Sequence, residues 1–301
     1  MTRPLGLYEE LLTLGLTRDV AELESLGFMA LRSTPTAAEA RVLLARHLLR
    51  LLTRALSDST GDEATDRQLE VARRVHTALG VLDGETTGSD DALAEPPRLL
   101  TAILRRPDGP AQAVDPTRPE IPLTASDLLV NARGEPRIGH SIAAEIPSAD
   151  QIDLVCAFVR WHGVRLLAGP LREFRALGRP FRIITTVYTG STEQRALDHL
   201  AEMGALVKVS YETQATRLHA KAWLFQRDSG YSTAYIGSSN LTHTALSEGV
   251  EWNVRISEAE TPALLGKFRA TFDSYWADPS FEDYDPVRFE KAIAATRRGS
   301  P

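Results

Sequence analysis

The amino-acid sequence predicts an α/β domain preceded by a mostly helical one. Near residue 125, helical periodicity gives way to alternating strand-like and helix-like segments. A strongly apolar run at residues 152–159 is followed by a helical pattern and by a second run at residues 181–186. With 43% hydrophobic residues in 301, the chain can build the cores of two ordinary domains.

Residues 1–104 are expected to form a helical accessory domain. Thr-Ala-Ala-Glu at residues 36–39 is a capping box that opens a long helix, in which leucines recur at helical spacing. A second capping box at residues 60–63 opens another helix that runs through Leu79. No set of residues with catalytic chemistry occurs in this segment.

A proline-rich connector is expected at residues 105–124, after an acidic loop rich in small residues at 84–96. The α/β domain is then assigned to residues 125–280. Residues 281–301 follow a stretch of Asp, Pro and Ser and end in a basic sequence, and we expect them to be a poorly ordered C-terminal tail.

Three residues near the carboxyl ends of the first two strands of this domain are candidate substrate contacts. Thr185 and Thr186 end the strand at 181–186, and open α/β sheets tend to bind ligands there. Contact with a phosphate and ordinary turn chemistry both remain open for the threonines. Arg160, at the start of the helix after the first strand, is also assigned to substrate binding.

The strongest chemical signal comes later in the domain. His219 and Lys221 begin a β-prone run and, because they are two residues apart, share one face of it. A second β-prone run ends in Gly-Ser-Ser-Asn at residues 237–240, which places a tight turn with hydroxyls and an amide at a strand end. A neutral histidine is a nucleophile, and Lys and Asn donate to phosphate oxygens. The pattern predicts a phosphate site, to which Ser238 and Ser239 are assigned as substrate contacts.

These residues resemble the HKD motif of the phospholipase D superfamily, H-x-K-x4-D followed by G-S-x-N. His219, Lys221 and Asn240 match the motif, whereas Gln226 stands at the position of its Asp. The resemblance implies a phospholipase D-like α/β/α sandwich for residues 125–280, which would then be the catalytic domain.

Glu251 narrows the resemblance to the metal-independent nucleases of the superfamily, including those of the BfiI type. In these enzymes a Glu that follows the Asn completes the site, and Glu251 follows Asn240 by eleven residues. The resemblance implies that Glu251 replaces the missing Asp and hydrogen-bonds an imidazole nitrogen of His219. Asp228, two residues beyond the motif position, is the alternative acid.

The implied reaction needs no metal and no cofactor. His219 attacks the phosphorus and forms a phosphohistidine intermediate, while Lys221 and Asn240 hold the oxygens. A second histidine must protonate the leaving oxygen, and the chain has one H-x-K. We therefore expect a homodimer with the two motifs at its interface. His243 is a further candidate for the acid, or an ordinary surface residue.

The whole chain is also similar to the amino-terminal portion of bacterial DEAD/DEAH-box helicases that carry a phospholipase D-like domain ahead of their motor. The similarity includes residues 7–11, 126–131 and 271–276, but the phosphate-binding loop and the Asp-Glu-Ala-Asp box are absent. It implies nucleic acid, with DNA expected, a helicase partner, and a role in DNA processing or defence. A separate protein and an excised domain remain open.

Composition limits the other functions. A net charge of −6 argues against nonspecific coating of nucleic acid, so a phosphate-binding surface must be local. Arg172, Arg175, Arg179 and Arg182 form such a surface, or the first three of them belong to a solvated helix face. No apolar run reaches the roughly eighteen residues of a membrane span, and the first residues lack a signal-peptide core, so we expect a cytoplasmic protein.

Two other functions remain open on the sequence. The first is a catalytically idle nucleic-acid-binding module, in which Gln226 marks a degenerate site. The second is hydrolysis of phospholipids. The sequence does not determine whether a nucleic-acid substrate is DNA or RNA, whether it is single- or double-stranded, or whether it is cleaved at a preferred sequence.

Overall fold

The residues that the computed structural model describes are 13–27, 34–57, 64–82, 117–131, 137–212, 218–247, 249 and 251–299. The chain divides into two compact units, Met1–Ile103 and Leu104–Pro301, and each is described by itself. In the part of the chain that is described, no helix is long and apolar enough to cross a membrane.

The described secondary-structure elements of the first unit are all helices, as the sequence predicts. Its helices are α1 (Leu14–Ser25), α2 (Ala37–Ser57) and α3 (Ala64–Leu82). The Gln68 side chain of α3 donates to the carbonyl oxygen of Leu56 in α2 over 3.0 Å. The predicted capping box at 60–63, the acidic loop at 84–96 and residues 105–116 of the connector lie outside the described residues.

The second unit is built on one eight-stranded sheet with the order β1-β7-β6-β5-β2-β3-β4-β8. β2, β3 and β4 are parallel, and every other neighbouring pair is antiparallel. The strands are β1 (Asp127–Val130), β2 (Gln151–Cys156), β3 (Phe181–Thr186), β4 (Leu206–Ser210), β5 (Lys221–Gln226), β6 (Thr233–Gly237), β7 (Trp252–Ser257) and β8 (Phe281–Asp283).

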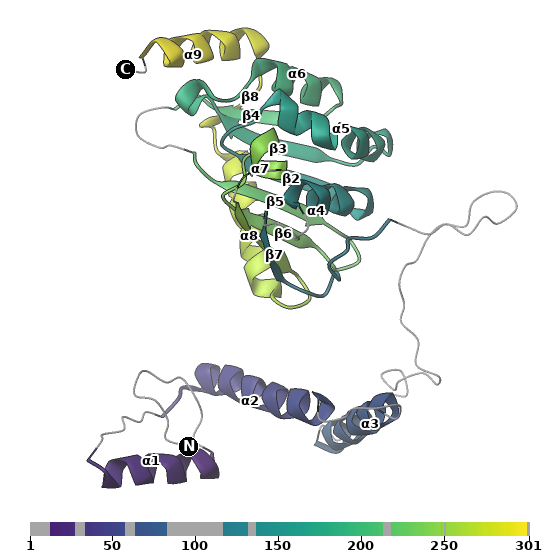
Figure 1. Cartoon of the computed structure of the whole chain (residues 1–301), viewed down its shortest axis with the longest axis vertical. Helices are drawn as coiled ribbons and strands as arrows, with labels where there is room; N and C mark the ends of the chain where they lie inside the picture. The colour runs from purple at the N-terminus through teal and green to yellow at the C-terminus, as the bar shows by residue number, and fades with distance from the viewer. Residues whose placement is uncertain are drawn as a thin grey trace, which may run out of the picture. The chain divides into compact units, whose positions relative to one another are not determined.

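Helices cover both faces of this sheet, so the predicted α/β/α sandwich is confirmed (Figure 1). The main core lies between the sheet and α4 (Ile138–Glu145), α5 (Trp161–Ala176), α6 (Gln194–Glu202), α7 (His243–Ser247) and α9 (Pro286–Gly299). The opposite face packs against α8 (Pro262–Ala277). Among the described residues, η2 (Ile146–Ser148) and η3 (Tyr188–Gly190) are short 3-10 turns.

The position of α5 depends on a close approach to the chain that follows β6. Its buried stripe of Val164, Leu167, Leu171 and Phe174 has helical spacing and packs on the sheet. At Gly163 an added Cβ would lie 2.4 Å from the carbonyl oxygen of Leu241, so a larger residue does not fit. The amino end of α5 therefore lies against residues 240–242.

Residues 281–299 belong to the fold, and the prediction of a poorly ordered tail is wrong for them. β8 extends the sheet by pairing antiparallel with β4. α9 buries Phe289 and Ile293 in the main core. These elements could not be predicted from the sequence, because β8 is only three residues long and α9 contributes few apolar side chains to the core.

A buried carboxylate joins α4 to the strands beneath it. Glu145 is completely buried, and its oxygens accept hydrogen bonds from Arg227 at 2.5 Å, Arg255 at 2.8 Å, Thr233 at 2.9 Å and Tyr235 at 3.0 Å. Burial alone would raise the pKa of Glu145, but the charges of Arg227 and Arg255 outweigh it, so the pKa lies below its ordinary value.

Candidate active site

The predicted catalytic residues come together at one edge of the sheet. Lys221 begins β5 and His219 precedes it, Asn240 follows the end of β6, and Glu251 directly precedes β7. Because β6 runs antiparallel to both β5 and β7, its end lies beside the beginnings of those two strands. Three separate chain segments thus meet at this edge.

His219 and Lys221 are in direct contact. The Lys221 Nζ atom lies 3.0 Å from His219 Nδ1, 3.1 Å from Nε2, and 2.7 Å from the His219 carbonyl oxygen. The imidazole is exposed, whereas only 8% of Lys221 is accessible. Burial lowers the pKa of Lys221, while Cys156 and Glu251 oppose the shift. An accessible imidazole beside an ammonium suits a nucleophile and an oxyanion donor.

Asn240 has a defined amide orientation. Its Oδ1 accepts a hydrogen bond of 3.2 Å from the backbone N–H of Phe158, so its two amide N–H groups remain as donors. Cys156 supports the same turn, because its Sγ atom accepts from the Leu241 N–H at 3.1 Å. Burial raises the pKa of Cys156 to about 11, which keeps the thiol neutral near pH 7.

The two serines of the turn have different environments. Ser238 is exposed, accepts a hydrogen bond of 3.1 Å from the Trp252 N–H, and donates to the Glu251 carboxylate. Ser239 is buried, and its hydroxyl accepts from the Asn253 amide at 2.7 Å. The prediction of a substrate contact therefore fits Ser238 but not Ser239.

Glu251 lies at the site but contacts a different residue than expected. Its carboxylate accepts a hydrogen bond from the Ser238 hydroxyl, whereas the imidazole of His219 contacts Lys221. The physical reason is strand order: β6 lies between β7, which follows Glu251, and β5, which follows His219. Burial lowers the pKa of Lys221, and the charge of Glu251 opposes this shift by favouring the protonated form.

Thr185 and Thr186 support the edge from within. Both are completely buried. The Thr185 hydroxyl donates to the Ala157 carbonyl at 3.4 Å, and the Thr186 hydroxyl donates to the Ser210 carbonyl at 3.1 Å. The geometry therefore favours backbone support over the predicted substrate contact.

Arg160 and Phe158 flank the site on the β2 side. Arg160 is exposed at the amino end of α5, and its backbone N–H donates to the Leu241 carbonyl at 2.9 Å. The Phe158 ring stands edge-on to the His219 ring with centroids 6.1 Å apart. Sequence reasoning missed Phe158, because its only signal was an aromatic residue within an apolar run.

Gln226, at the position of the motif's Asp, lies at the far end of β5 from Lys221. Its amide donates to Asp153 Oδ2 over 2.6 Å. Asp153 is completely buried and also accepts from Arg182 at 2.7 and 2.9 Å, and Arg182 binds Asp273 of α8 at 2.9 Å. Gln226 therefore belongs to a polar cluster that joins α8 to the sheet.

Asp228 and His243, the other acids considered from the sequence, have contacts outside the candidate site. Asp228 follows the far end of β5 and is remote from Lys221 along the strand, so it does not supply the missing acid. His243 begins α7, and its Nδ1 lies 3.2 Å from the hydroxyl of Ser247 in the same helix.

Three arginines of the predicted basic cluster are engaged within the fold. Arg175 bonds the carbonyl oxygens of Met203 and Arg179. Arg179 bonds those of Pro147 and Ala149, both at 2.8 Å, and Arg182 is paired as described above. Arg172 is exposed on α5.

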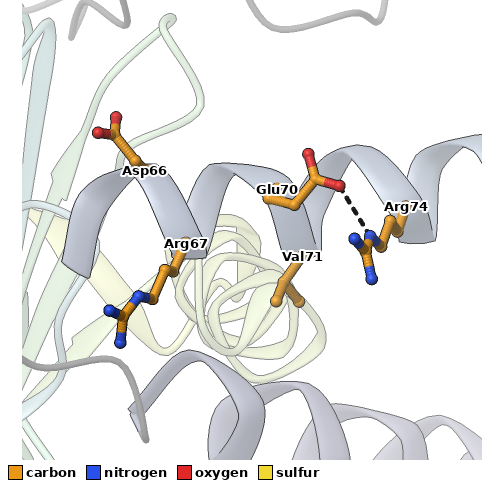
Figure 2. A pocket seen from close by; sticks show the side chains of 5 residues that line it. All are labelled: Asp66, Arg67, Glu70, Val71 and Arg74. Atoms are coloured by element: carbon orange, nitrogen blue, oxygen red, sulfur yellow. Dashed lines mark hydrogen bonds and ion pairs between the residues drawn. The ribbon is translucent and has the colours of Figure 1, made fainter. Parts of the chain in front are cut away.

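A hollow on α3 of the first unit lacks the chemistry of the site. It is lined by Asp66, Arg67, Glu70, Val71 and Arg74, and Figure 2 shows them along the helix. Arg74 Nε and Glu70 Oε1 form an exposed ion pair of 2.8 Å. Within the described ranges of both units, no group of three or more His, Cys, Asp or Glu side chains is placed to hold a metal ion.

Residues 142–276 match the protein family described as "Cardiolipin synthase, PLD-like domain". The match spans the candidate site from Phe158 to Glu251. No curated protein matches the chain.

Several solved structures are similar to this chain. Nuc of Salmonella typhimurium, described as a phospholipase D family member, is 19% identical over 53% of this chain and 97% of its own, with a TM-score of 0.42. NucT of Helicobacter pylori is 17% identical over 53% and 99%, also with a TM-score of 0.42. Phosphatidylserine synthase of Haemophilus influenzae is 11% identical over 58% and 45%, with a TM-score of 0.41.

The surroundings of Gln226 predict that an acid at this position is harmful. Gln226→Glu keeps the side-chain length but brings a carboxylate against buried Asp153, and we expect a loss of about 2–4 kcal/mol in the free energy of unfolding. The loss should be larger at pH 8 than at pH 5, because protonation relieves the repulsion. Urea unfolding at both values measures it.

Two further variants act as controls for this effect. Gln226→Met removes the amide without adding a charge, and its cost should not grow between pH 5 and pH 8. Gln226→Asp restores the motif's residue, but it should not raise turnover. Equal stability of Gln226→Glu and the native protein at pH 8 would show that this account of the cluster is wrong.

Proposed function

Because residues 142–276 form a domain of the phospholipase D superfamily, we propose that this protein is a metal-independent phosphodiesterase that cleaves nucleic acid, with DNA as the expected substrate. The observation that carries the proposal is the exposed His219 ring, 3.0 Å from Lys221 Nζ. Asn240 beside it has its Oδ1 already bonded and its N–H groups available. A nucleophile and two donors for phosphate oxygens therefore share one edge.

The proposed reaction has two steps. A ring nitrogen of His219 attacks the phosphorus, an N–P bond forms, and the bond to the leaving oxygen breaks with its electron pair on that oxygen. The leaving oxygen takes a proton from a general acid. Water then attacks the phosphohistidine and gives a proton to the same group, now acting as a base. The N–P bond breaks with its electron pair on the His219 nitrogen, and a phosphate monoester is released. Lys221 and Asn240 stabilise the charge on the nonbridging oxygens in both steps.

The general acid is proposed to be His219 of a second copy in a homodimer. An apolar row on the sheet face that carries α8 supports this arrangement. Leu128, Val254 and Ile236 lie opposite one another on β1, β7 and β6, and they are 47%, 47% and 40% exposed. Trp252, beside Ser238, is 62% exposed. Exposed apolar patches of this kind mark interaction surfaces.

Glu251 is proposed to act as a positioning residue. It accepts from Ser238, and its charge favours the protonated form of the partly buried Lys221. The resemblance of the whole chain to helicase amino-terminal regions extends the proposal to a helicase partner in DNA processing or defence.

The central prediction is cleavage without a metal. Incubation with labelled single- and double-stranded DNA and RNA in EDTA should show cleavage of at least one substrate. His219→Ala should reduce the rate at least about a thousandfold, because it removes the nucleophile, while binding measured by fluorescence anisotropy is retained. His243→Ala is the matched control and should keep its activity.

The outcomes of this experiment separate the alternatives. Equal binding by both proteins with no cleavage by either would identify an idle binding module and contradict the enzymatic proposal. Hydrolysis of phospholipid vesicles without cleavage of any nucleic acid would move the substrate to lipids.

The dimer is tested through the apolar row. Light scattering at assay concentration should show a dimer, and Val254→Glu should shift it toward monomer and lower activity in parallel, because the substitution buries an unpaired charge. Leu264→Glu, on an exposed position of α8, is the control. A native protein that is fully active as a strict monomer rules the dimer out.

The role of Glu251 predicts a change in pH dependence. Because the Glu251 charge raises the pKa of Lys221, Glu251→Gln lowers that pKa further. If activity requires the ammonium, the alkaline limb of kcat/KM moves to lower pH, and kcat at pH 8 falls. Glu173→Gln, an exposed change on α5, should leave the profile unchanged. An unaltered profile in Glu251→Gln would refute this role.

A further inference from the structure

We propose that Arg195, held against the ring of Trp161, binds with Arg160 a phosphate adjacent to the scissile one. The inference rests on the proposed function and deepens it. It restricts the substrate to a strand that carries several phosphates, and it assigns a phosphate subsite outside the His219–Lys221–Asn240 set.

The chain between β2 and α5 runs along the candidate site and connects it to this subsite. Phe158 contacts the His219 ring and bonds the Asn240 amide. Two residues later, the Arg160 N–H bonds the Leu241 carbonyl at 2.9 Å. Trp161 then begins α5. The residues that follow Phe158 therefore lie directly beside the turn that carries Asn240.

Arg195 reaches this segment from the first turn of α6. Glu193 joins the two elements: its carboxylate accepts from the Trp161 N–H at 2.8 Å, and its own N–H donates to the Val159 carbonyl at 2.9 Å. The Arg195 Cζ atom lies 4.1 Å from the centroid of the Trp161 ring. His199 packs edge-on against the same ring, with centroids 5.1 Å apart. These contacts order the guanidinium before any ligand arrives.

Both guanidiniums are available to an anion. Arg160 and Arg195 are exposed, and no carboxylate pairs with either among the residues the structure describes. Arg227 and Arg255, in contrast, are committed to Glu145 inside the fold. A stacked guanidinium with free N–H groups matches the geometry of phosphate oxygens.

The chemistry of this subsite fits a nucleic-acid strand. Each nucleotide brings its own phosphate, so a strand whose scissile phosphate lies at His219 presents further phosphates on either side. The Trp161 ring beside the subsite adds the aromatic surface that proteins use with single strands. A phosphodiester that has only one phosphate places nothing at Arg195.

The test compares two substrates of the same protein. One is a labelled oligonucleotide of the type that the enzyme cleaves, and the other is bis(p-nitrophenyl) phosphate, which has a single phosphate. Arg195→Ala should raise KM for the oligonucleotide about tenfold and leave kcat/KM for the small substrate unchanged. Trp161→Ala should act in the same direction, because the guanidinium loses its support.

Salt dependence gives a readout that structural damage does not produce. For a single strand, loss of one phosphate contact should reduce the slope of log KM against log salt by about 0.7. Arg172→Ala is the control, since it removes the same charge from an exposed position on α5, about three turns beyond Trp161. It should change neither KM nor the slope.

Binding measured in His219→Ala protein separates this inference from the proposed function. If the native enzyme does not cleave but Arg195→Ala in the His219→Ala background weakens binding of the labelled strand, the proposed function fails and the subsite stands. Equal binding with and without Arg195 overturns the subsite. Equal losses in Arg172→Ala, equal losses on the small substrate, or Arg195-dependent binding to phosphatidylglycerol vesicles in place of the strand would also overturn it.

Discussion

The ion-paired cluster around Glu145 is the interaction on which the arrangement of the site strands depends. It binds Arg227 after β5, Thr233 and Tyr235 in β6, and Arg255 in β7. The same three strands carry the catalytic segments at their other ends. Removal of one charged partner from such a buried cluster typically costs about 3–5 kcal/mol, because an uncompensated charge remains. Glu145 of helix α4 therefore fixes these three strands at the ends that lie away from the site.

The two ends of β5 serve different purposes. At its beginning, Lys221 is kept beside an accessible imidazole with little of its surface in water. At its end, Gln226 completes the hydrogen bonds of buried Asp153, and Arg182 carries the connection on to α8. The substitution of the motif's Asp thus affects how α8 is attached to the sheet, at a distance from the proposed chemistry.

Local patterns predicted the layered fold and the core of the site, because period two in a strand and a Gly-Ser-Ser-Asn turn are properties of neighbouring residues. The structural reason for Gly237 itself is not local, since a Cβ there would meet the Trp252 carbonyl of the neighbouring strand at 2.1 Å. Burial of Ser239 and Thr186 depends on residues distant in sequence, so their roles were not readable. The predicted contact between Glu251 and His219 is absent for the same reason. β6 lies between the strands that follow these two residues.

Strand order also determines when the domain can form during synthesis. β1 pairs with β7, with Asp127 opposite Arg255, and β4 receives its edge partner β8 only after α8 has been made. Such pairings between distant segments are slow to form. During synthesis, β1 and β4 therefore lack these partner strands until β7 and β8 have been made. A nascent chain that has not yet released β7 also lacks the strand that positions Glu251. The catalytic edge is therefore completed only late in synthesis, when β7 has joined β6.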